Sequence, residues 1–269
     1  AMSDEMAFVD IHCHLIPEID DGAKSWDETL AMAEMAVDDG FTTTIVTPHQ
    51  LGTYEHNRGD VIRQRTRLLQ QELDARGIPL QVMPGADVRI EDAMLAGLRS
   101  GDVLTLGDHG QHVLLELPHE LYFPLEELLG QLERLGLTGI LSHPERNQGL
   151  LQQREEVAYL VEAGCLMQVT ASSFLGGMGP GPRDMAEWML AEGLIHFLAT
   201  DAHGPRSRRP LMRRAFEHVA LLSDWDTAYE ICCAQPADVA AGRPVAGGRR
   251  PRRAKRRTLT DWFTWRKAG

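Results

Sequence analysis

The sequence predicts a single α/β domain of the barrel class, because strand-like and helix-like segments alternate along the chain. Seven short apolar runs rich in Ile, Val and Leu are typical of buried parallel strands. They are Phe8–Ile11, Thr43–Val46, Leu80–Met83, Val113–Leu115, Gly139–Leu141, Leu166–Val169 and His196–Ala199. Most are followed by a histidine or a carboxylate, and a closed ring of strands would bring those carboxyl ends together. This favours a barrel over an open, doubly wound sheet.

Amphipathic stretches between these runs predict helices on the outside of the strands. They are Trp26–Asp38, Val61–Arg76, Leu125–Leu135, Glu155–Glu162 and Asp184–Glu192. A glycine follows each stretch closely, where a left-handed residue commonly ends a helix. These glycines are Gly40, Gly77, Gly136, Gly164 and Gly193.

Length and charge divide the chain into three parts. Its 269 residues suit one domain, which we place at residues 8–242, after an N-terminal extension (1–7) and before a tail (243–269). Ten of the 27 Lys and Arg residues lie in the tail, against a single acid, Asp261, so the rest of the chain is strongly acidic. Such a body argues against nucleic-acid binding.

Cysteine usage and hydropathy predict a cytoplasmic protein. The four cysteines do not form a disulfide framework, which fits a reducing compartment. No basic and apolar leader precedes the first strand, and no apolar run approaches the roughly 20 residues that span a bilayer.

Two short motifs at opposite ends of the chain predict a metal site. In a strand, residues two apart share a face, so His12-Cys13-His14 presents both imidazoles on one side and Cys13 on the other. Asp201-Ala202-His203 pairs a carboxylate with an imidazole in the same way. Either motif alone is weak evidence, but together they are seldom accidental.

Further candidate ligands follow the strands between these motifs. His49 and His143 stand beside prolines that fix the turn, and Asp87 and Glu116 supply carboxylates that can bridge two cations. A mixed set of nitrogen and oxygen donors suits Mn, Fe or Zn better than Mg. Alone, His49 or His143 would more often be an ordinary packing residue.

Other polar features have simpler interpretations. Six histidines are expected to be loop, surface or packing residues: His56, His109, His112, His119, His196 and His218. The glycine-rich segment Gly176–Pro182 lacks the strand, spacing and lysine of a phosphate-binding loop, and we interpret it as a mobile connection near the mouth of the site.

Seven motifs, in order, resemble the PHP (polymerase and histidinol phosphatase) superfamily. They are Asp10–His14, Ile19–Ala23, Thr47–His49, Pro84–Asp87, Glu116–Pro118, His143–Asn147 and Ala199–His203. More narrowly, they resemble its bacterial capsule and exopolysaccharide branch of manganese-dependent protein-tyrosine phosphatases. The similarity runs from about Phe8 to Pro244.

The resemblance implies a distorted seven-stranded (β/α)7 barrel that holds two to three metal ions, with Mn²⁺ favoured and Fe or Zn as alternatives. By motif, the implied ligands form three sets. The first ion would take His12, His14, Asp87 and Asp201; the second Asp87, Glu116 and His143; the third Asp21, His49 and His203. Asp20 is the alternative to Asp21. The family usually has Glu where this chain has Asp87, whose side chain is one methylene shorter.

The expected chemistry is attack of an activated water on phosphorus, with arginine binding the phosphate oxygens. Arg146 follows a ligand motif and is the first candidate; Arg208 is the second, with Arg206 as its rival. The expected substrate is a tyrosine-phosphorylated protein, namely a bacterial tyrosine kinase of polysaccharide synthesis. Two alternatives stay open: another PHP phosphomonoesterase, such as a histidinol-phosphate or nucleotide phosphatase, and a weakly catalytic regulatory module in which Asp87 limits metal loading.

The tail combines arginines and lysines with a run of aromatic residues, Trp262 to Trp265. This composition is typical of a segment that lies on an anionic membrane surface, here the inner face. Docking onto an acidic partner or onto the protein's own acidic body, and simple disorder, are the alternatives.

Overall fold

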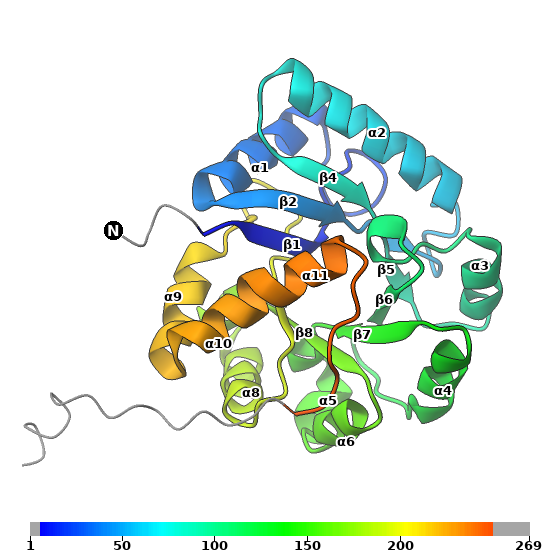
Figure 1. Ribbon diagram of the computed structural model, residues 1–269, viewed down its shortest axis with the longest axis vertical. Helices are drawn as coiled ribbons and strands as arrows, with labels where there is room; N and C mark the ends of the chain where they lie inside the picture. Colours follow the sequence, from blue (N-terminus) through cyan, green and yellow to red (C-terminus); the bar gives the residue numbers. More distant parts are fainter. Residues whose placement is uncertain (1–5, 250–269) are drawn as a thin grey trace, which may run out of the picture.

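Parallel strands with helices packed around them make up the fold of the computed structural model, which describes residues 6–249 (Figure 1). The described strands form two sheets, ordered β1-β2-β4 and β3-β5-β6-β7-β8-β9. The bounds are β1 Phe8–Cys13, β2 Phe41–Val46, β3 His49–Gln50, β4 Gln81–Pro84, β5 Asp87–Arg89, β6 His112–Glu116, β7 Thr138–Ser142, β8 Leu166–Thr170 and β9 Phe197–Ala199.

Helices connect most successive strands and cover the outside of the sheets (Figure 1). The α-helices are α1 Trp26–Asp39, α2 Gly59–Ala75, α3 Met94–Ser100, α4 Glu126–Arg134, α5 Gln148–Gln152, α6 Glu156–Glu162, α7 Ala171–Phe174, α8 Pro180–Ala191, α9 Arg213–Leu222, α10 Trp225–Tyr229 and α11 Gln235–Ala240. Two short 3-10 segments, Leu106–Asp108 and Pro144–Arg146, and a π-helical segment, Glu230–Ala234, complete the described elements. None of the helices between residues 6 and 249 is long and apolar enough to cross a membrane.

The five glycines predicted to end helices all have the expected backbone. Their φ angles are 108° at Gly40, 68° at Gly77, 73° at Gly136, 92° at Gly164 and 69° at Gly193. Only glycine adopts this left-handed region without a steric penalty. The ends of these helices are therefore set locally.

The predicted α/β class with parallel strands is confirmed, whereas the closed barrel is not, because the described strands form two separate sheets. Between β2 and β3 the chain passes through Pro48, which has no N–H to continue a ladder, and between β4 and β5 it passes through Gly85 and Ala86. These two interruptions lie side by side, since Asp87 N donates to Pro48 O at 3.2 Å. The strands consequently form two sheets instead of one continuous ring.

The gap between β9 and β1 is bridged by backbone contacts beyond the end of β9. Asp201 N donates to His12 O at 2.8 Å, and His14 N donates to Ala202 O at 2.9 Å. A single isolated bridge pairs Cys13 with Ala202. The two metal motifs from the ends of the chain are thereby fixed next to each other.

An apolar core fills the space enclosed by the strands. It is formed mainly by inward side chains of successive strands, including Ile11, Ile45, Leu114 and Ile140, and by Val239 of α11. In Figure 1, α11 crosses the middle of the view, between the smaller sheet and strands β7 and β8. Because α11 contacts the segment before β6, it covers the amino ends of the strands. The carboxyl ends remain open for a site.

Two expectations need correction. The glycine-rich segment is not a connection throughout, because α8 begins at Pro180 instead of Asp184; proline is well tolerated in a first helical turn. The short helices α3, α5 and α7 and the C-terminal helices α9, α10 and α11 were not predicted at all. Four buried free cysteines agree with the expected absence of disulfides. The tail predicted to contact a membrane lies, from residue 250 on, outside the described residues.

Candidate metal centre

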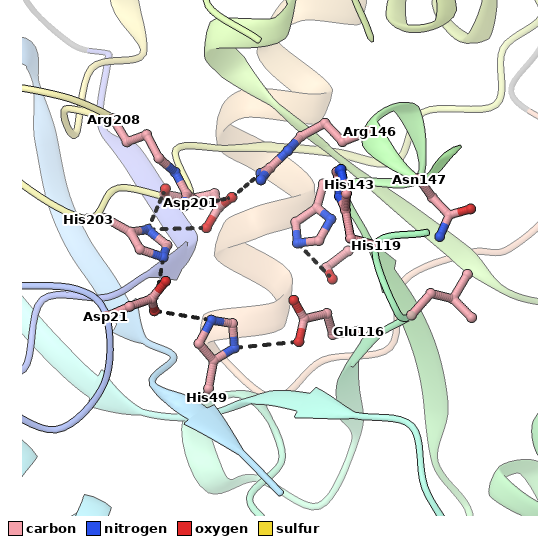
Figure 2. Close-up of a pocket in the computed structure, with 12 residues that line it drawn as sticks. Asp21, His49, Glu116, His119, His143, Arg146, Asn147, Asp201, His203 and Arg208 are labelled. Atoms are coloured by element: carbon pink, nitrogen blue, oxygen red, sulfur yellow. Dashed lines mark hydrogen bonds and ion pairs between the residues drawn. The ribbon is translucent and has the colours of Figure 1, made fainter. Parts of the chain in front are cut away.

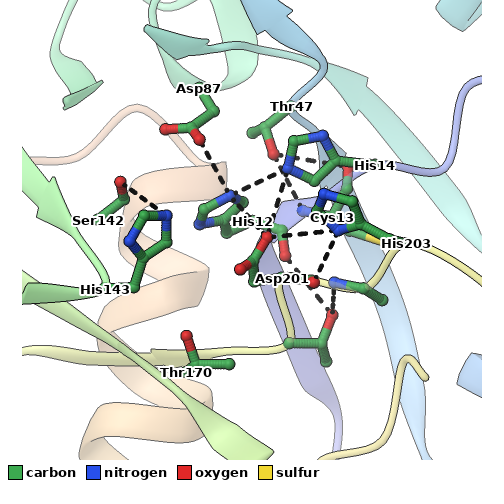
Figure 3. A network of polar contacts seen from close by, with 12 residues as sticks. His12, Cys13, His14, Thr47, Asp87, Ser142, His143, Thr170, Asp201 and His203 are labelled. Atoms are coloured by element: carbon green, nitrogen blue, oxygen red, sulfur yellow. Dashed lines mark hydrogen bonds and ion pairs between the residues drawn. The ribbon is translucent and has the colours of Figure 1, made fainter. Parts of the chain in front are cut away.

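The structure brings all nine predicted metal ligands together at the carboxyl ends of the strands. They form four overlapping groups, in each of which the potential ligand atoms lie within 4.8 Å of one another. The groups are His14, Asp21, His49 and His203; His12, His14 and Asp87; His12, His143 and Asp201; and His49, Asp87 and Glu116. Figures 2 and 3 show these side chains pointing toward one another from the surrounding elements.

The innermost part of the cluster is built on His12 and His14 of the first motif. Their Nε2 atoms lie 3.2 Å apart. Asp201 Oδ1 lies 3.2 Å from His12 Nε2 and 3.4 Å from His14 Nε2, and Asp87 Oδ2 lies 3.5 Å from His12 Nε2. Donor atoms that share one ion at about 2.1 Å are themselves separated by about 3.0–3.5 Å. These separations therefore fit a common cation.

The outer part of the cluster is built on His49, Asp21 and His203. Asp21 Oδ1 lies 3.3 Å from His49 Nε2 and 3.4 Å from His203 Nε2. The other ring nitrogen of His49, Nδ1, lies 3.4 Å from Asp87 Oδ2 and 3.5 Å from Glu116 Oε2. His49 thus faces two groups at once.

The grouping differs from the expected sets, and His14 is shared between an inner and the outer group. His143 falls with His12 and Asp201, whereas Glu116 and Asp87 fall with His49. The shared register of two short strands explains the second group, because β3 and β5 place His49 directly opposite Asp87. Asp87 belongs to two groups despite its short side chain, as a bridging carboxylate would.

Asp20 and Asp21, the two alternatives left by the sequence, have separate surroundings. Asp20 Oδ2 lies 2.8 Å from His14 Nδ1, on the side of the ring away from the cluster, and its carboxylate also accepts from the backbone N–H groups of Gly22 and His49. Asp21 is half exposed and faces the cluster instead. Asp20 therefore orients ligands, and Asp21 is the candidate ligand.

Gln168 of β8 plays the same part for His12 and was missed by the sequence analysis. Its Oε1 lies 2.8 Å from His12 Nδ1, and both side chains are buried. Because an amide oxygen can only accept, the proton is held on Nδ1 and Nε2 is left free to bind a cation. The available signal was a lone polar residue inside an otherwise apolar strand.

Arg146 and Arg208 converge on the same carboxylate oxygen, Asp201 Oδ2. The other oxygen of Asp201, Oδ1, faces His12 and His14. Both arginines line a cavity together with candidate ligands (Figure 2). Arg206, the rival of Arg208, is 89% exposed and points to Glu28. The geometry therefore favours Arg208.

Charge in the cluster is unbalanced. Burial opposes ionisation of Asp87 and Asp201, but the neighbouring cationic groups, with His12 the strongest, together outweigh it and hold the pKa of both carboxyls well below the usual range. Burial would lower the pKa of His12, but Asp201 and Asp87 outweigh it and raise that pKa to about 9. Burial and the charge of Asp87 raise the pKa of Glu116 to about 7. The side chains thus present closely spaced carboxylates that favour bound cations.

None of the six histidines given simpler interpretations belongs to the four ligand groups, and His218 is a partly buried residue of α9. His112 and His196 are buried away from the cluster, and His56 and His109 are exposed. His119 is an exposed loop residue, but it lies on the rim of the cavity (Figure 2).

Comparison with known protein families identifies the family of the chain. The model of the capsular polysaccharide synthesis family CpsB/CapC matches residues 8–241. The chain belongs to this family. The narrower of the two resemblances seen in the sequence, to the capsule and exopolysaccharide branch, is thereby confirmed.

Relatives of known name cover most of the chain. The tyrosine-protein phosphatase YwqE of Bacillus subtilis is 33% identical over 202 residues, which are 74% of this chain and 79% of YwqE. The putative tyrosine-protein phosphatase CapC of Staphylococcus aureus is 29% identical over 209 residues, 77% of this chain and 82% of CapC.

A solved structure supports the same relationship. It comes from work on YwqE of Bacillus subtilis and CpsB of Streptococcus pneumoniae, described as unique metal-dependent tyrosine phosphatases. It matches 92% of this chain and all of its own, with a TM-score of 0.86 and 28% identity.

Proposed function

We propose that this protein is a metal-dependent phosphatase that hydrolyses phosphotyrosine in proteins. The observation that carries the proposal is the convergence of nine side chains with nitrogen and oxygen donors in one cluster, beside a cavity that two arginines line. Membership of a family whose relatives are named tyrosine-protein phosphatases supports it.

The donor set fits two to three divalent ions. The inner ligands would be His12, His14, Asp87, His143 and Asp201, and the outer ones would be His49, Glu116, Asp21 and His203. Imidazole and carboxylate together suit Mn²⁺ best, with Fe or Zn as alternatives, because Mg²⁺ prefers oxygen alone. When bound, such ions lower the pKa of a water toward neutrality and so supply a nucleophile.

The chain's own residues hold the substrate. Arg146 and Arg208 are anchored beside the cluster by Asp201, and their guanidinium groups would bind the oxygens of the phosphoryl group and the charge that develops on them. Gln168 and Asp20 keep His12 and His14 in place. A tyrosine phenolate, with a pKa of about 10, leaves without full protonation, so the reaction makes little demand for a separate acid.

We also propose that the strands form a barrel. If β2 with β3, and β4 with β5, each count as one interrupted strand, the described strands number seven in a ring whose ends meet at the bridge between Cys13 and Ala202. This arrangement supports a distorted seven-stranded barrel with the site at its carboxyl end.

The partner we propose is a tyrosine-phosphorylated protein, specifically a tyrosine kinase of capsule or exopolysaccharide synthesis. The family description, capsular polysaccharide synthesis, supports this process. We place the protein in the cytoplasm. Contact of its tail with the inner membrane face concerns residues outside the described part of the chain and stays a prediction.

The test is phosphate release from a phosphotyrosine peptide by protein reconstituted with Mn²⁺. We expect activity that resists thiol alkylation, is abolished by chelation, and falls at least about 100-fold in His143→Ala and Arg146→Ala. Histidinol phosphate and nucleotide monophosphates serve as competing substrates. Faster turnover of these small esters than of the peptide would favour another phosphomonoesterase, and full activity after chelation would reject metal dependence.

A further inference from the structure

A second cleft adjoins the cavity of the metal centre. It has a volume of about 320 Å³ and is lined by His49, Gln50, Leu51, Gly52, Thr53, Tyr54, Arg89 and Glu116. His49 and Glu116 also line the first cavity, so the two hollows meet along these side chains. A peptide whose phosphorylated residue occupies the first cavity therefore has this cleft directly beside it.

One wall of the second cleft is a tight turn from Leu51 to Tyr54. Tyr54 N donates to Leu51 O at 2.9 Å, and Gly52 N donates to Glu91 Oε2 at 3.1 Å. Leu51 has a φ of 72°, a left-handed conformation that a branched, non-glycine residue rarely adopts. The turn is thus held in a defined shape next to His49.

The ring of Tyr54 stacks on the imidazole of His49. Their centroids lie 5.3 Å apart with an interplanar angle of 21°. Tyr54 is partly exposed and lines the cleft, so it offers an amphipathic surface there. The cleft therefore carries an aromatic platform that is packed against the candidate metal centre.

Arg89 supplies a positive charge on the same cleft. It lies two residues after Asp87 in β5 and is 38% exposed. Its ion pair with Glu116 is long, at 4.0 Å between Nη1 and Oε2. Glu116 is also the carboxylate grouped with Asp87 and His49. If Glu116 binds a cation, the negative charge of this carboxylate is compensated by the cation and no longer balances the positive charge of Arg89.

A guanidinium beside an aromatic ring is suited to binding an anionic side chain. The anionic group forms paired hydrogen bonds with the guanidinium, and the apolar part of the side chain packs on the ring. The general acidity of the body does not oppose this, because charges beyond about 8–10 Å are largely screened at physiological salt. A charge within contact distance acts locally.

We propose that Arg89 and Tyr54 form a subsite for an anionic residue adjacent to the phosphotyrosine, either a carboxylate or a second phosphotyrosine. The proposal rests on the proposed function and names the class of peptide that the site prefers. One charge-assisted contact at a partly exposed site corresponds to about a 5- to 10-fold preference.

The test uses peptides with one scissile phosphotyrosine that differ only in the flanking residue, which is Glu, a non-hydrolysable phosphotyrosine analogue, Gln or Lys. We expect wild-type kcat/KM to be about 5- to 10-fold higher for the anionic flanks than for Lys, mainly through KM. Arg89→Gln should reduce this ratio to near one. Arg67→Gln removes an exposed arginine from α2 and is the matched control, which should keep the ratio.

p-Nitrophenyl phosphate, which has no flanking residue, corrects for any effect on the metal centre. Equal wild-type rates on Glu and Lys peptides would overturn the inference while leaving the proposed function intact. An Arg89→Gln variant whose kcat/KM falls by the same factor on every substrate would also overturn the inference, because Arg89 would then act only through Glu116. Failure of metal-loaded wild type to hydrolyse any phosphotyrosine peptide would overturn the proposed function, and the subsite with it. A preference for only one of the two anionic flanking residues would show whether the subsite accepts a carboxylate or a second phosphotyrosine.

Discussion

The hydrogen bond between Gln168 and His12 makes a quantitative prediction about metal affinity. Gln168→Leu keeps the volume of the buried side chain but removes the acceptor that lies 2.8 Å from His12 Nδ1. The Nδ1 proton is then buried without a partner, at a cost of about 1–3 kcal/mol. If this cost destabilises the conformation of His12 that binds metal, the affinity for Mn²⁺ drops about 5- to 150-fold, because 1.4 kcal/mol corresponds to a factor of ten. Loss of such supporting residues typically costs 10- to 100-fold.

The assay is a Mn²⁺ titration of the apo-protein, followed by calorimetry and by phosphotyrosine-peptide turnover. We expect the apparent Kd for Mn²⁺ to rise while kcat at saturating Mn²⁺ is largely restored. Gln168→Glu retains an acceptor at the same position and should keep affinity near that of wild type. Gln64→Leu, at an exposed position of α2, controls for the change of residue type. An unchanged Kd in Gln168→Leu would refute the reasoning.

Three further predictions follow from the described contacts. Arg208→Ala should lower kcat/KM on phosphotyrosine peptides by about 100-fold, whereas Arg206→Ala, which removes an exposed guanidinium, should change it less than twofold; equal losses would contradict the assignment. Asp87→Asn should reduce the number of bound ions by at least one, because Asp87 is buried and shared by two groups; elemental analysis of the purified variant measures this, and an unchanged ratio would exclude a bridging role. Burial lowers the pKa of His112 from 6.5 to about 4 in the folded protein. As the pH drops from 6.5 toward 4, the imidazole is therefore protonated in the unfolded chain but not in the folded one, so the free energy of unfolding falls. The loss is at most about 3 kcal/mol, and His112→Asn should show a correspondingly flatter pH dependence of unfolding by denaturant.

Strand and helix patterns were predictable because they are local. Buried runs of Ile, Val and Leu identified the main strands, and glycines identified the ends of helices such as α1 at Gly40. Position at or just after a strand end indicated eight of the nine candidate ligands, since parallel strands bring their carboxyl ends together, whereas Asp21 was named only from the family resemblance.

Other features depended on contacts that the local sequence does not contain. Gln168 acts on His12, 156 positions away, and nothing near either residue specifies that pairing. Asp20 and Asp21 are adjacent in sequence, so only their side-chain directions separate an orienting role from a ligand role.

Helix α11 was missed for a different reason. Pro236 is typical of a helix break, but here it lies at the start of α11, directly after a π-helical segment. The two interruptions in the strands likewise depend on Pro48 and its neighbours across the sheet. Both cases show tertiary packing accommodating a local irregularity.

Metal content of the wild-type protein, measured after Mn²⁺ reconstitution and removal of free ions, tests the central claim most directly. Nine convergent donors predict two to three ions per chain, lost together with phosphotyrosine hydrolysis on chelation and regained with it on adding Mn²⁺. Fewer than two ions per chain without turnover would contradict the account and favour a weakly catalytic regulatory module instead.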